Sequence, residues 1–307
     1  MIDLHTHSSV SDGNFSPSCL MEHAAKQGLS ALALTDHETI GGIDQAAKAA
    51  AEHKMRFIPG VELEITWNRN GEFHLLGLGI ERPTVDFVSA LEELARRRRE
   101  RNLEMVNMMN KAGISVSYDE IIAFATGHSA HGQHSSGQNS PSIGRPHFAA
   151  FLVKRKIARN MEQAFLRYLG RDRVFYIPKA GLEFERAVKL IHESGGIAIL
   201  AHPMSLYTAW GRLPPLLEDL KERGLDGLEA WHPSAKVTSC LRLEEQAKRL
   251  KIHITAGSDF HGEARPGRKL GITAGGRKID KSFLENIPQL GRYMIRTCDP
   301  HGVNVVL

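Results

Sequence analysis

Residues 2–13 read IDLHTHSSVSDG and combine a short apolar strand pattern with two histidines and an aspartate. Alternate residues of a strand point to the same face, so His5 and His7 are expected to present two imidazoles side by side. Asp12 follows in a turn rich in serine and glycine. Taken alone, the stretch also fits a surface strand with two solvated histidines, so the rest of the chain has to decide between these interpretations.

Short apolar runs alternate with helical patterns at both ends of the chain. Residues 16–28 have the pattern of a helix, with Ser16 as N-cap, Pro17 in the first turn and Gly28 as the stop. Repeated strand–helix units predict a largely parallel sheet, either a barrel or a doubly wound sheet. Strands are expected at 2–6, 31–35, 56–66, 73–80, 197–203, 225–231 and 252–262.

The middle of the chain has only helical patterns, from about residue 84 to residue 170. We interpret this segment as a helical insert or cap between two parts of one domain, residues 1–83 and 171–290, followed by a tail at 291–307. Within the insert, residues 127–142 are rich in serine, glycine and histidine and have no apolar periodicity. This segment, with His128, His131 and His134, is expected to be a mobile surface loop.

The composition is that of an ordinary globular protein, with 42% hydrophobic and 24% charged residues in 307. Cys19, Cys240 and Cys298 are widely separated, which argues against a disulfide framework and fits a reducing cytoplasm. The chain has no signal-peptide pattern and no apolar run long enough to cross a bilayer, so no membrane association is expected. The net charge of +4 permits an anionic substrate.

Histidines and acids gather at the predicted strand ends, and the chain holds 16 histidines in all. Parallel strand–helix folds place reactive groups at the carboxyl ends of their strands, so these side chains are expected to converge. Each one alone has a simpler explanation, as a core histidine or a loop cap, but together they indicate a metal site. The set is His5, His7, Asp12, His37, Glu62, His74, His202, Asp259 and His261.

Nine ligands suffice for two or three divalent ions. Mixed imidazole and carboxylate donors suit manganese, iron or zinc better than calcium or magnesium. Two such ions about 3.5–4 Å apart can activate a water molecule and neutralise a phosphoryl oxygen. Manganese is our first expectation, with iron or zinc as alternatives.

The segments DLHTHSSVSDG, ALTDHETIGG, IPGVEL, FHLLGLGI, AILAHP and GSDFHG together resemble, in order, the motif series of the PHP family, named for polymerase and histidinol phosphatase. The resemblance implies an α/β fold, a distorted (β/α)7 barrel, with a trinuclear metal centre that uses the nine residues above. It implies that Glu62 bridges two metals. Asp12, His37 and His261 would hold the third metal near the leaving oxygen, and His37 is one candidate to protonate it.

Within the family, RRRRERN at 96–102 and IGRPHF at 143–148 are similar to phosphoesterases that act on nucleotides. These include the 3′,5′-nucleoside bisphosphate phosphatases and ribonuclease AM, a 5′→3′ exonuclease on short RNA. The resemblance implies that the insert closes over the barrel mouth. It suggests substrate contacts by Arg98, Arg101, Asn102, Arg145 and His147. The role of His232 stays open, because Ala235 stands where many relatives carry a second histidine.

The residues themselves support these contacts less strongly than the metal ligands. Arg98 and Arg101 lie three apart on one helix face, and a guanidinium group can hold a phosphate with two hydrogen bonds. A solvated basic stripe between neighbouring glutamates fits the same pattern equally well. For Arg145 and His147, a simple helix start is also an alternative.

We therefore expect a metal-dependent phosphoesterase that cleaves phosphate monoesters or diesters of a nucleotide or short RNA. The alternatives are a small-molecule phosphatase acting on a substrate like histidinol phosphate, an amidohydrolase-type C–N hydrolase and a non-catalytic metal-binding module. No stable binding of duplex DNA is expected. The sequence leaves the exact substrate, the general acid and the oligomeric state open.

Overall fold

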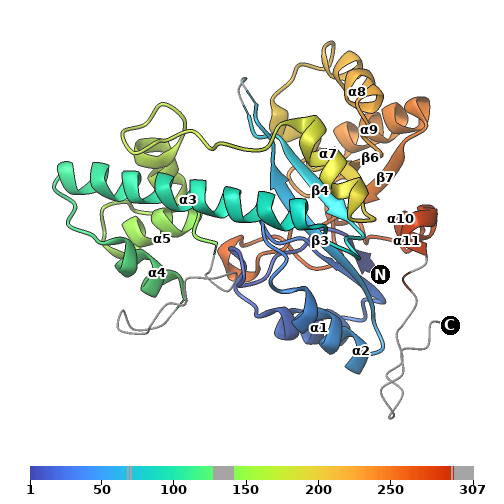
Figure 1. Cartoon of the computed structure of the whole chain (residues 1–307), viewed down its shortest axis with the longest axis horizontal. Helices are drawn as coiled ribbons and strands as arrows, with labels where there is room; N and C mark the ends of the chain where they lie inside the picture. The colour runs from blue at the N-terminus through green and yellow to red at the C-terminus, as the bar shows by residue number, and fades with distance from the viewer. Residues whose placement is uncertain (68, 70, 127–141, 292, 294–307) are drawn as a thin grey trace.

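Seven strands form one sheet in the same order in which they occur along the chain (Figure 1). The structure is a computed structural model that describes residues 1–67, 69, 71–126, 142–291 and 293. The strands are β1 (Ile2–Asp3), β2 (Ala31–Leu34), β3 (Arg56–Glu64), β4 (His74–Leu78), β5 (Ile197–Leu200), β6 (Gly227–Trp231) and β7 (His253–Ala256). All seven were expected from the apolar runs, although most are shorter than those runs.

The sheet curls until its two edges meet. A parallel bridge joins Thr6, just after β1, to Phe260, just after β7. The amide of His7 donates to the carbonyl of Phe260 at 2.9 Å, and the amide of Asp259 donates to the carbonyl of His5 at 2.9 Å. The expected distorted seven-stranded barrel is thereby confirmed, and its closure brings the first and last motifs of the sequence together.

Strand β4 runs antiparallel to both of its neighbours, whereas the other neighbouring strands are parallel. His74 is the first residue of β4 and pairs with Glu64, near the carboxyl end of β3. The expectation that each ligand lies at the carboxyl end of a parallel strand is therefore wrong for His74. Because the β3–β4 connection is short and reverses the chain, the start of β4 lies at the same edge as the ends of the others.

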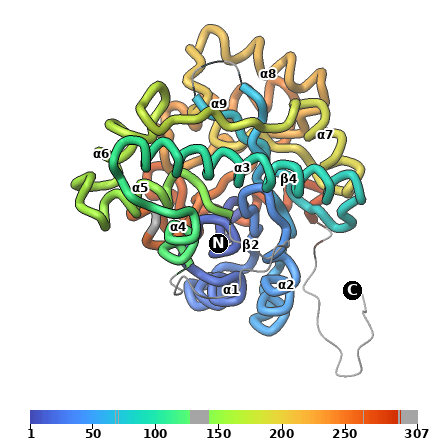
Figure 2. The backbone as a smooth tube through the Cα atoms, turned by 60° about the vertical axis from the view of Figure 1, so that its left-hand side comes forward, coloured from blue at the N-terminus to red at the C-terminus, as the bar shows by residue number. Residues whose placement is uncertain are grey.

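Helices cover the outside of the barrel. They are α1 (Pro17–Lys26), α2 (Ile43–Glu52), α7 (Phe184–Glu193), α8 (Leu213–Glu222) and α9 (Val237–Leu250), with the short α10 (Ser282–Glu285) and α11 (Pro288–Gly291) near the end. Helices α1 and α2 lie side by side on one side of the strands, and α8 and α9 lie on the other (Figures 1 and 2). As predicted, the Ser16 side chain caps α1, accepting from the amide of Cys19 at 3.3 Å.

The helical middle consists of α3 (Val85–Lys111), α4 (Tyr118–Thr126), α5 (Arg145–Lys154), α6 (Met161–Ala164) and the π-helical turn η1 (Phe165–Leu169). Helix α3 reaches from the barrel to the other helices of this group (Figure 1). Its first half, with Phe87 and Leu94, belongs to the barrel core. Its second half, with Met105 and Met109, belongs to a separate core shared with Phe148 of α5.

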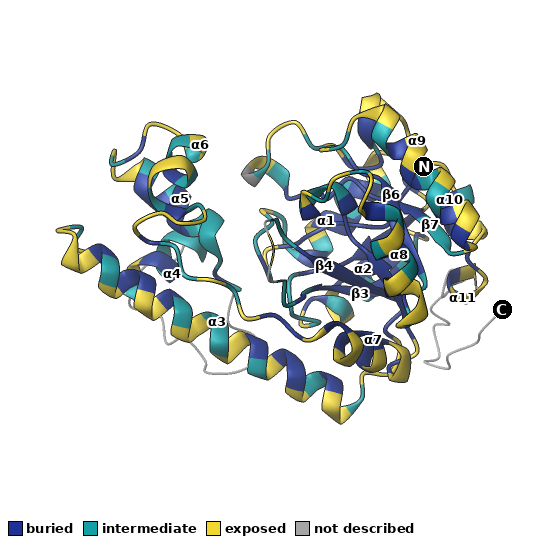
Figure 3. Ribbon diagram, turned by 90° about the horizontal axis from the view of Figure 1, so that it is seen from above, coloured by how far each residue is buried: buried dark blue, intermediate teal, exposed yellow. Residues whose placement is uncertain are grey.

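Exposed and buried positions alternate along the whole length of α3, whereas most residues of the barrel strands are buried (Figure 3). On the basis of the two cores we propose the division of the chain at residues 84 and 170. The proposed loop with His128, His131 and His134 lies outside the described residues, as does most of the tail at 291–307. None of the helices in the described part of the chain has the length and apolar character needed to span a bilayer.

Candidate metal centre and substrate cavity

Glu62 lies at the centre of the predicted ligands and is buried within β3. Its Oε1 is 2.8 Å from His74 Nδ1 and 2.9 Å from His202 Nε2. Its Oε2 is 3.0 Å from His37 Nδ1 and 3.3 Å from His7 Nε2. One carboxylate thus faces two separate groups of imidazoles, an arrangement suited to a ligand shared between two ions.

A second group consists of His5, His7 and Asp259, all buried. The Nε2 atoms of His5 and His7 are 3.1 Å apart, as expected for residues on one face of a strand. Asp259 Oδ1 lies 3.2 Å from His7 Nε2 and 3.5 Å from His5 Nε2. Three donor atoms therefore converge on one point from the two edges of the closed sheet.

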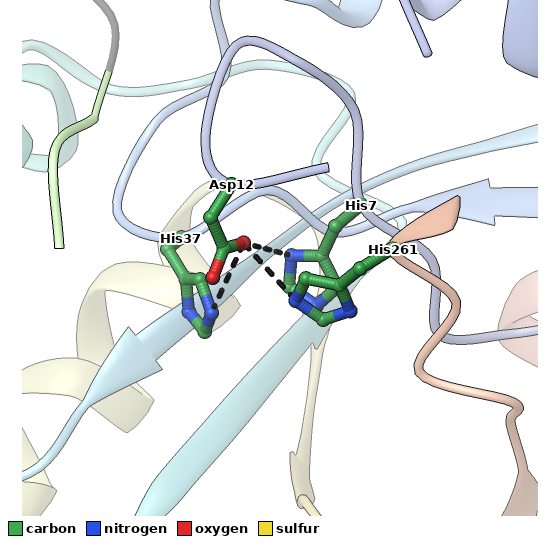
Figure 4. A group of neighbouring side chains, drawn as sticks. All are labelled: His7, Asp12, His37 and His261. Carbon is green, nitrogen blue, oxygen red and sulfur yellow. Dashed lines mark ion pairs between the residues drawn. The ribbon is translucent and has the colours of Figure 1, made fainter. Parts of the chain in front are cut away.

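The third group surrounds Asp12, as Figure 4 shows. Asp12 Oδ1 is 3.0 Å from His261 Nε2, 3.6 Å from His37 Nε2 and 3.9 Å from His7 Nδ1. The three histidines approach this carboxylate from three different parts of the chain. His7 belongs to both the second and the third group.

The donor set fits divalent metal ions. Four buried atoms make no hydrogen bond to any described residue: His7 Nδ1, Asp12 Oδ1, Glu62 Oε2 and His261 Nε2. Buried polar atoms normally have a partner, and a cation would supply one to all four. The mixture of imidazole and carboxylate donors is the one that manganese, iron and zinc accept.

Electrostatics keep the three carboxylates of the cluster ionised. Burial alone would raise the pKa of Glu62, but His37, His74 and His5 lower it well below the usual range. The pKa of Asp12 is lowered likewise, against its burial, by His261 and His37. Ionised carboxylates are the form that coordinates a metal ion.

Glu229 on β6 contacts two of the predicted ligands, His5 and His202, and was not identified from the sequence. Its Oε1 lies 3.1 Å from His5 Nδ1, and its Oε2 accepts from the amide of His202 at 2.8 Å. Gly257 makes room for this contact, because a Cβ there would lie 2.3 Å from the Cβ of His5 and 2.5 Å from Glu229 Oε1. A single charge in the apolar strand GLEAW was the signal that could have identified Glu229.

Replacing Glu229 by glutamine is expected to lower metal affinity by about 10- to 100-fold. Glutamine can still accept a hydrogen bond, but it loses the charge that helps to raise the pKa of His5 well above its ordinary value, against burial. A metal titration followed by calorimetry measures the effect. Glu218→Gln on the exposed face of α8 serves as control, and equal affinities in the two variants would contradict this positioning role.

Two further buried carboxylates hold the ligand-bearing loops. Asp36 accepts from the amide and hydroxyl of Ser8 at 2.7 and 2.6 Å and from the hydroxyl of Ser11 at 2.5 Å. Asp3 accepts from the amide of Ser258 at 2.9 Å. These bonds fix the segments that carry Asp12 and Asp259, so both aspartates support ligands without themselves being in the cluster.

The backbone is strained at two ligands. His202 has φ +27° and Asp259 has φ +50°, in the left-handed region that non-glycine residues rarely adopt. Such strain costs about 1–3 kcal/mol per residue and is concentrated at functional sites. The ties of His202 to Glu229 and of Asp259 to the His5 carbonyl hold these conformations.

A cavity of about 240 Å³ lies between the cluster and the helical insert. The barrel contributes Asp12, His37 and His74 to its wall, together with Glu38, Glu64 and Glu72. Its cationic lining consists of Arg97, Arg98, Arg101, Arg145, Lys179 and Arg265. The three predicted contacts Arg98, Arg101 and Arg145 are therefore brought to one space beside the cluster.

Most of these cations already have a carboxylate partner. Arg98 pairs with Glu38, Arg145 with Glu72 at 2.7 Å, and Lys179 with Glu64 at 2.5 Å. Arg97 pairs likewise with Glu93, and Arg265 pairs with Asp259.

Arg101 differs from the other cavity cations. It forms no ion pair with any described carboxylate, and its buried Nε has no hydrogen-bond partner among the described residues. Burial and the neighbouring Arg145 lower its pKa to about 10. An anion in the cavity would relieve both the missing hydrogen bond and the repulsion.

The structure does not bring Asn102, His147 or His232 to the cavity wall. Asn102 is fully buried, and its amide donates to the carbonyl of Ile143 at 2.8 Å, which ties α3 to the segment before α5. His147 Nδ1 accepts from the amide of Gly144 at 3.0 Å and caps α5. His232 is buried with its Nε2 3.3 Å from Asp259 Oδ2.

Lys179 and Arg265 are cavity residues that sequence reasoning missed. Both lie in irregular segments, in PKAG and EARPG, where no periodicity marks a functional side chain. Glu64 was also missed, although it follows Glu62 by two residues in one strand and so shares its face. It lies 2.7 Å from His74 Nε2, opposite the Nδ1 that faces Glu62.

Comparison with known proteins agrees with this arrangement. A PHP domain profile matches residues 3–175 of the chain. A 5′-3′ exoribonuclease from Haemophilus influenzae is 34% identical over 84% of this chain and 89% of its own length. A 3′,5′-nucleoside bisphosphate phosphatase from Chromobacterium violaceum is 31% identical over 89% of this chain and 91% of its own.

A solved structure points the same way. An amidohydrolase from Chromobacterium violaceum, with bound sulfate and no metal, has a TM-score of 0.78 at 30% identity, covering 90% of this chain and 92% of that one. The similarity extends through the barrel and the insert alike. By its motifs, its fold and these relatives, the chain belongs to the PHP domain family.

Proposed function

We propose that this protein is a metal-dependent phosphoesterase that hydrolyses phosphate ester bonds of a nucleotide or short RNA. The observation that carries the proposal is the Arg101 guanidinium, which has no carboxylate partner among the described residues, in a cavity whose other wall includes Asp12, His37 and His74 of the ligand cluster. A metal-ligand cluster opposite such a cation suits an anionic ester placed between them. The names of the related exoribonuclease and bisphosphate phosphatase support a nucleotide as that ester.

The metal ligands are proposed to be His5, His7, Asp12, His37, Glu62, His74, His202, Asp259 and His261. When bound, two or three divalent ions at these residues supply Lewis acidity and lower the pKa of water. The donor chemistry favours manganese, with iron or zinc as alternatives.

The cavity cations are proposed to hold the substrate. Arg101 and Arg145 approach from the insert, and the guanidinium fork of each can take two oxygens of one phosphate. Asp12 and His37 line the cavity, whereas His261 is 1% exposed behind them. His37 is therefore proposed to deliver the proton to the leaving oxygen, with the ionised Asp12 carboxylate 3.6 Å from its Nε2.

The proposed setting is the reducing cytoplasm. Cys19 and Cys240 are free thiols, which supports this setting. The proposed partner is the nucleotide or RNA substrate itself, without stable binding to duplex DNA.

Hydrolysis of a panel of substrates, measured by chromatography of the products, tests the proposal. The panel contains adenosine 3′,5′-bisphosphate, AMP, histidinol phosphate and a 5′-phosphorylated oligoribonucleotide, each with manganese, together with an amide and a lactone. Turnover of the bisphosphate or the oligoribonucleotide is the expected result, and nucleotide release from the latter would indicate the exonuclease. Preference for histidinol phosphate would overturn the nucleotide assignment, and cleavage of only the amide or lactone would overturn the phosphoesterase.

Replacing Arg101 by alanine is expected to raise KM at least about tenfold with a smaller change in kcat, because a charge-assisted hydrogen bond contributes about 1.5–3 kcal/mol. Arg145→Ala should act in the same direction. Steady-state kinetics on the best substrate measure both variants. Arg96→Ala, on the exposed side of the same helix and paired with Glu100, is the matched control. An unchanged KM in both cavity variants would show that these two arginines of the insert do not bind the substrate.

A further inference from the structure

The insert contains a π-helical turn directly beside the cavity. Residues Phe165–Leu169 continue α6 with a wider winding, closed by the amide of Gly170 donating to the carbonyl of Phe165 at 2.8 Å. A Cβ at Gly170 would lie 2.7 Å from that carbonyl oxygen, so only glycine permits this closure. Such turns are rare and are often found at functional sites.

The turn places Phe165 in the cavity wall. Phe165 is half-buried, with part of its surface against the core of the insert and part toward the cavity. The cavity is otherwise lined by six cations, six acidic or imidazole groups from the barrel edge, and a few apolar or small residues. Among the described lining residues, Phe165 is the single phenyl, tyrosyl or indolyl ring.

The ring of Phe165 has no aromatic partner among the described residues, unlike its neighbours. Tyr168, on the same turn, stacks on Phe175 at 5.8 Å, and Tyr176 lies under the Arg145 guanidinium at 5.4 Å. The insert thus uses its other rings for internal packing. An unstacked ring in a charged cavity is a surface suited to a planar apolar group.

We propose that Phe165 is a base-stacking residue, which makes the cavity selective for phosphoesters that carry a nucleobase over those that carry only a sugar. The cations Arg101, Arg145 and Lys179 can bind any phosphorylated sugar, since they recognise charge. Every nucleobase has a π-face, so stacking on Phe165 favours nucleotides without distinguishing one base from another. This inference rests on the proposed phosphoesterase function and adds the residue that selects a substrate with a nucleobase.

Phe165→Leu tests the inference, because leucine keeps the apolar contact with the insert core and removes the π-face. The substrates are adenosine 3′,5′-bisphosphate and a baseless analogue, 1-O-methylribose 3,5-bisphosphate, both with manganese. Base–aromatic stacking contributes about 1–3 kcal/mol per base, which corresponds to a loss of about 5- to 150-fold. We expect kcat/KM and affinity for the adenosine compound to fall within that range, with less than a twofold change for the analogue.

Two further variants separate stacking from folding. Phe165→Trp retains a π-face and is expected to keep the preference for the nucleotide. Tyr168→Leu disturbs the same turn away from the cavity wall and is expected to affect both compounds equally. Equal losses on both compounds in Phe165→Leu, or no loss on either, would overturn the inference.

Calorimetric binding of the two compounds distinguishes this inference from the proposed function. Wild-type protein that releases no phosphate could still bind the nucleotide more tightly than the analogue. If Phe165→Leu removes that difference in affinity, the stacking inference is supported and the proposed phosphoesterase activity is overturned. If wild-type protein hydrolyses both compounds with equal efficiency and binds them with equal affinity, the stacking inference is overturned and the proposed phosphoesterase activity is supported.

Discussion

Replacing Glu62 by glutamine is expected to lower kcat by at least about 1000-fold and to remove most of the bound metal. Glutamine has nearly the same size, so the change removes the charge and little else. Glu62 is the one carboxylate in contact with both the His74–His202 pair and the His7–His37 pair. Without it, the ions of both groups lose their shared anion, and their mutual repulsion is no longer screened.

Elemental analysis of purified protein and steady-state kinetics measure the effect of Glu62→Gln together. Glu52→Gln, at the exposed end of α2, is the control and is expected to keep full metal content and rate. Near-normal turnover with full metal content in Glu62→Gln would disprove the proposed shared ligand. Loss of activity with full metal content would instead show that Glu62 is needed for catalysis and not for metal binding.

Removal of divalent ions with a chelator is expected to abolish turnover and to lower the melting temperature. An ion present at 100 times its Kd stabilises the folded state by about 2.7 kcal/mol, so two or three ions have a large combined effect. The four buried donor atoms without hydrogen bonds lose their partner when the ions leave. Differential scanning calorimetry before and after dialysis against the chelator measures the shift independently of activity.

Adding ions back to the dialysed protein tests the donor chemistry. Manganese, iron or zinc is expected to restore the melting temperature and the rate, whereas calcium should restore little, because it prefers sites built from oxygen ligands. Equal melting temperatures with and without manganese would show that no manganese ion bound at the cluster stabilises the folded state. Full recovery with calcium alone would contradict the imidazole ligands.

The sequence was most informative where residues recur in phase with a regular element. His5 and His7 are two apart just after β1, and Asp259 and His261 are two apart after β7, so both pairs could be recognised from spacing alone. The structure gathers the nine predicted ligands into three groups, and Glu62 links its own group to His7 and His37 of the others. The strand–helix alternation predicted a largely parallel sheet and left a barrel and a doubly wound sheet open, and the resemblance to the PHP family indicated the seven-stranded barrel.

What the sequence could not predict depends on strand direction and on irregular segments. His74 was assigned to a strand end, but only the antiparallel run of β4 explains how the start of that strand reaches the cluster. Lys179 and Arg265 reach the cavity from loops, whose paths no periodicity encodes. Asn102 was grouped with its arginine neighbours, yet one residue along a helix turns a side chain by about 100°, here into the insert core.

Helix α3 has a consequence for how enzymes of this shape can diverge. Its contacts with the barrel core end near Leu94, and its contacts with the insert core begin near Met105. The span between them is about 15 Å of helix, and it carries Arg97, Arg98 and Arg101. Because these side chains belong to neither core, mutation can exchange them at little cost in stability. New substrate preferences can therefore arise by substitutions along this part of the cavity wall, while the metal-binding half of the molecule stays under separate selection.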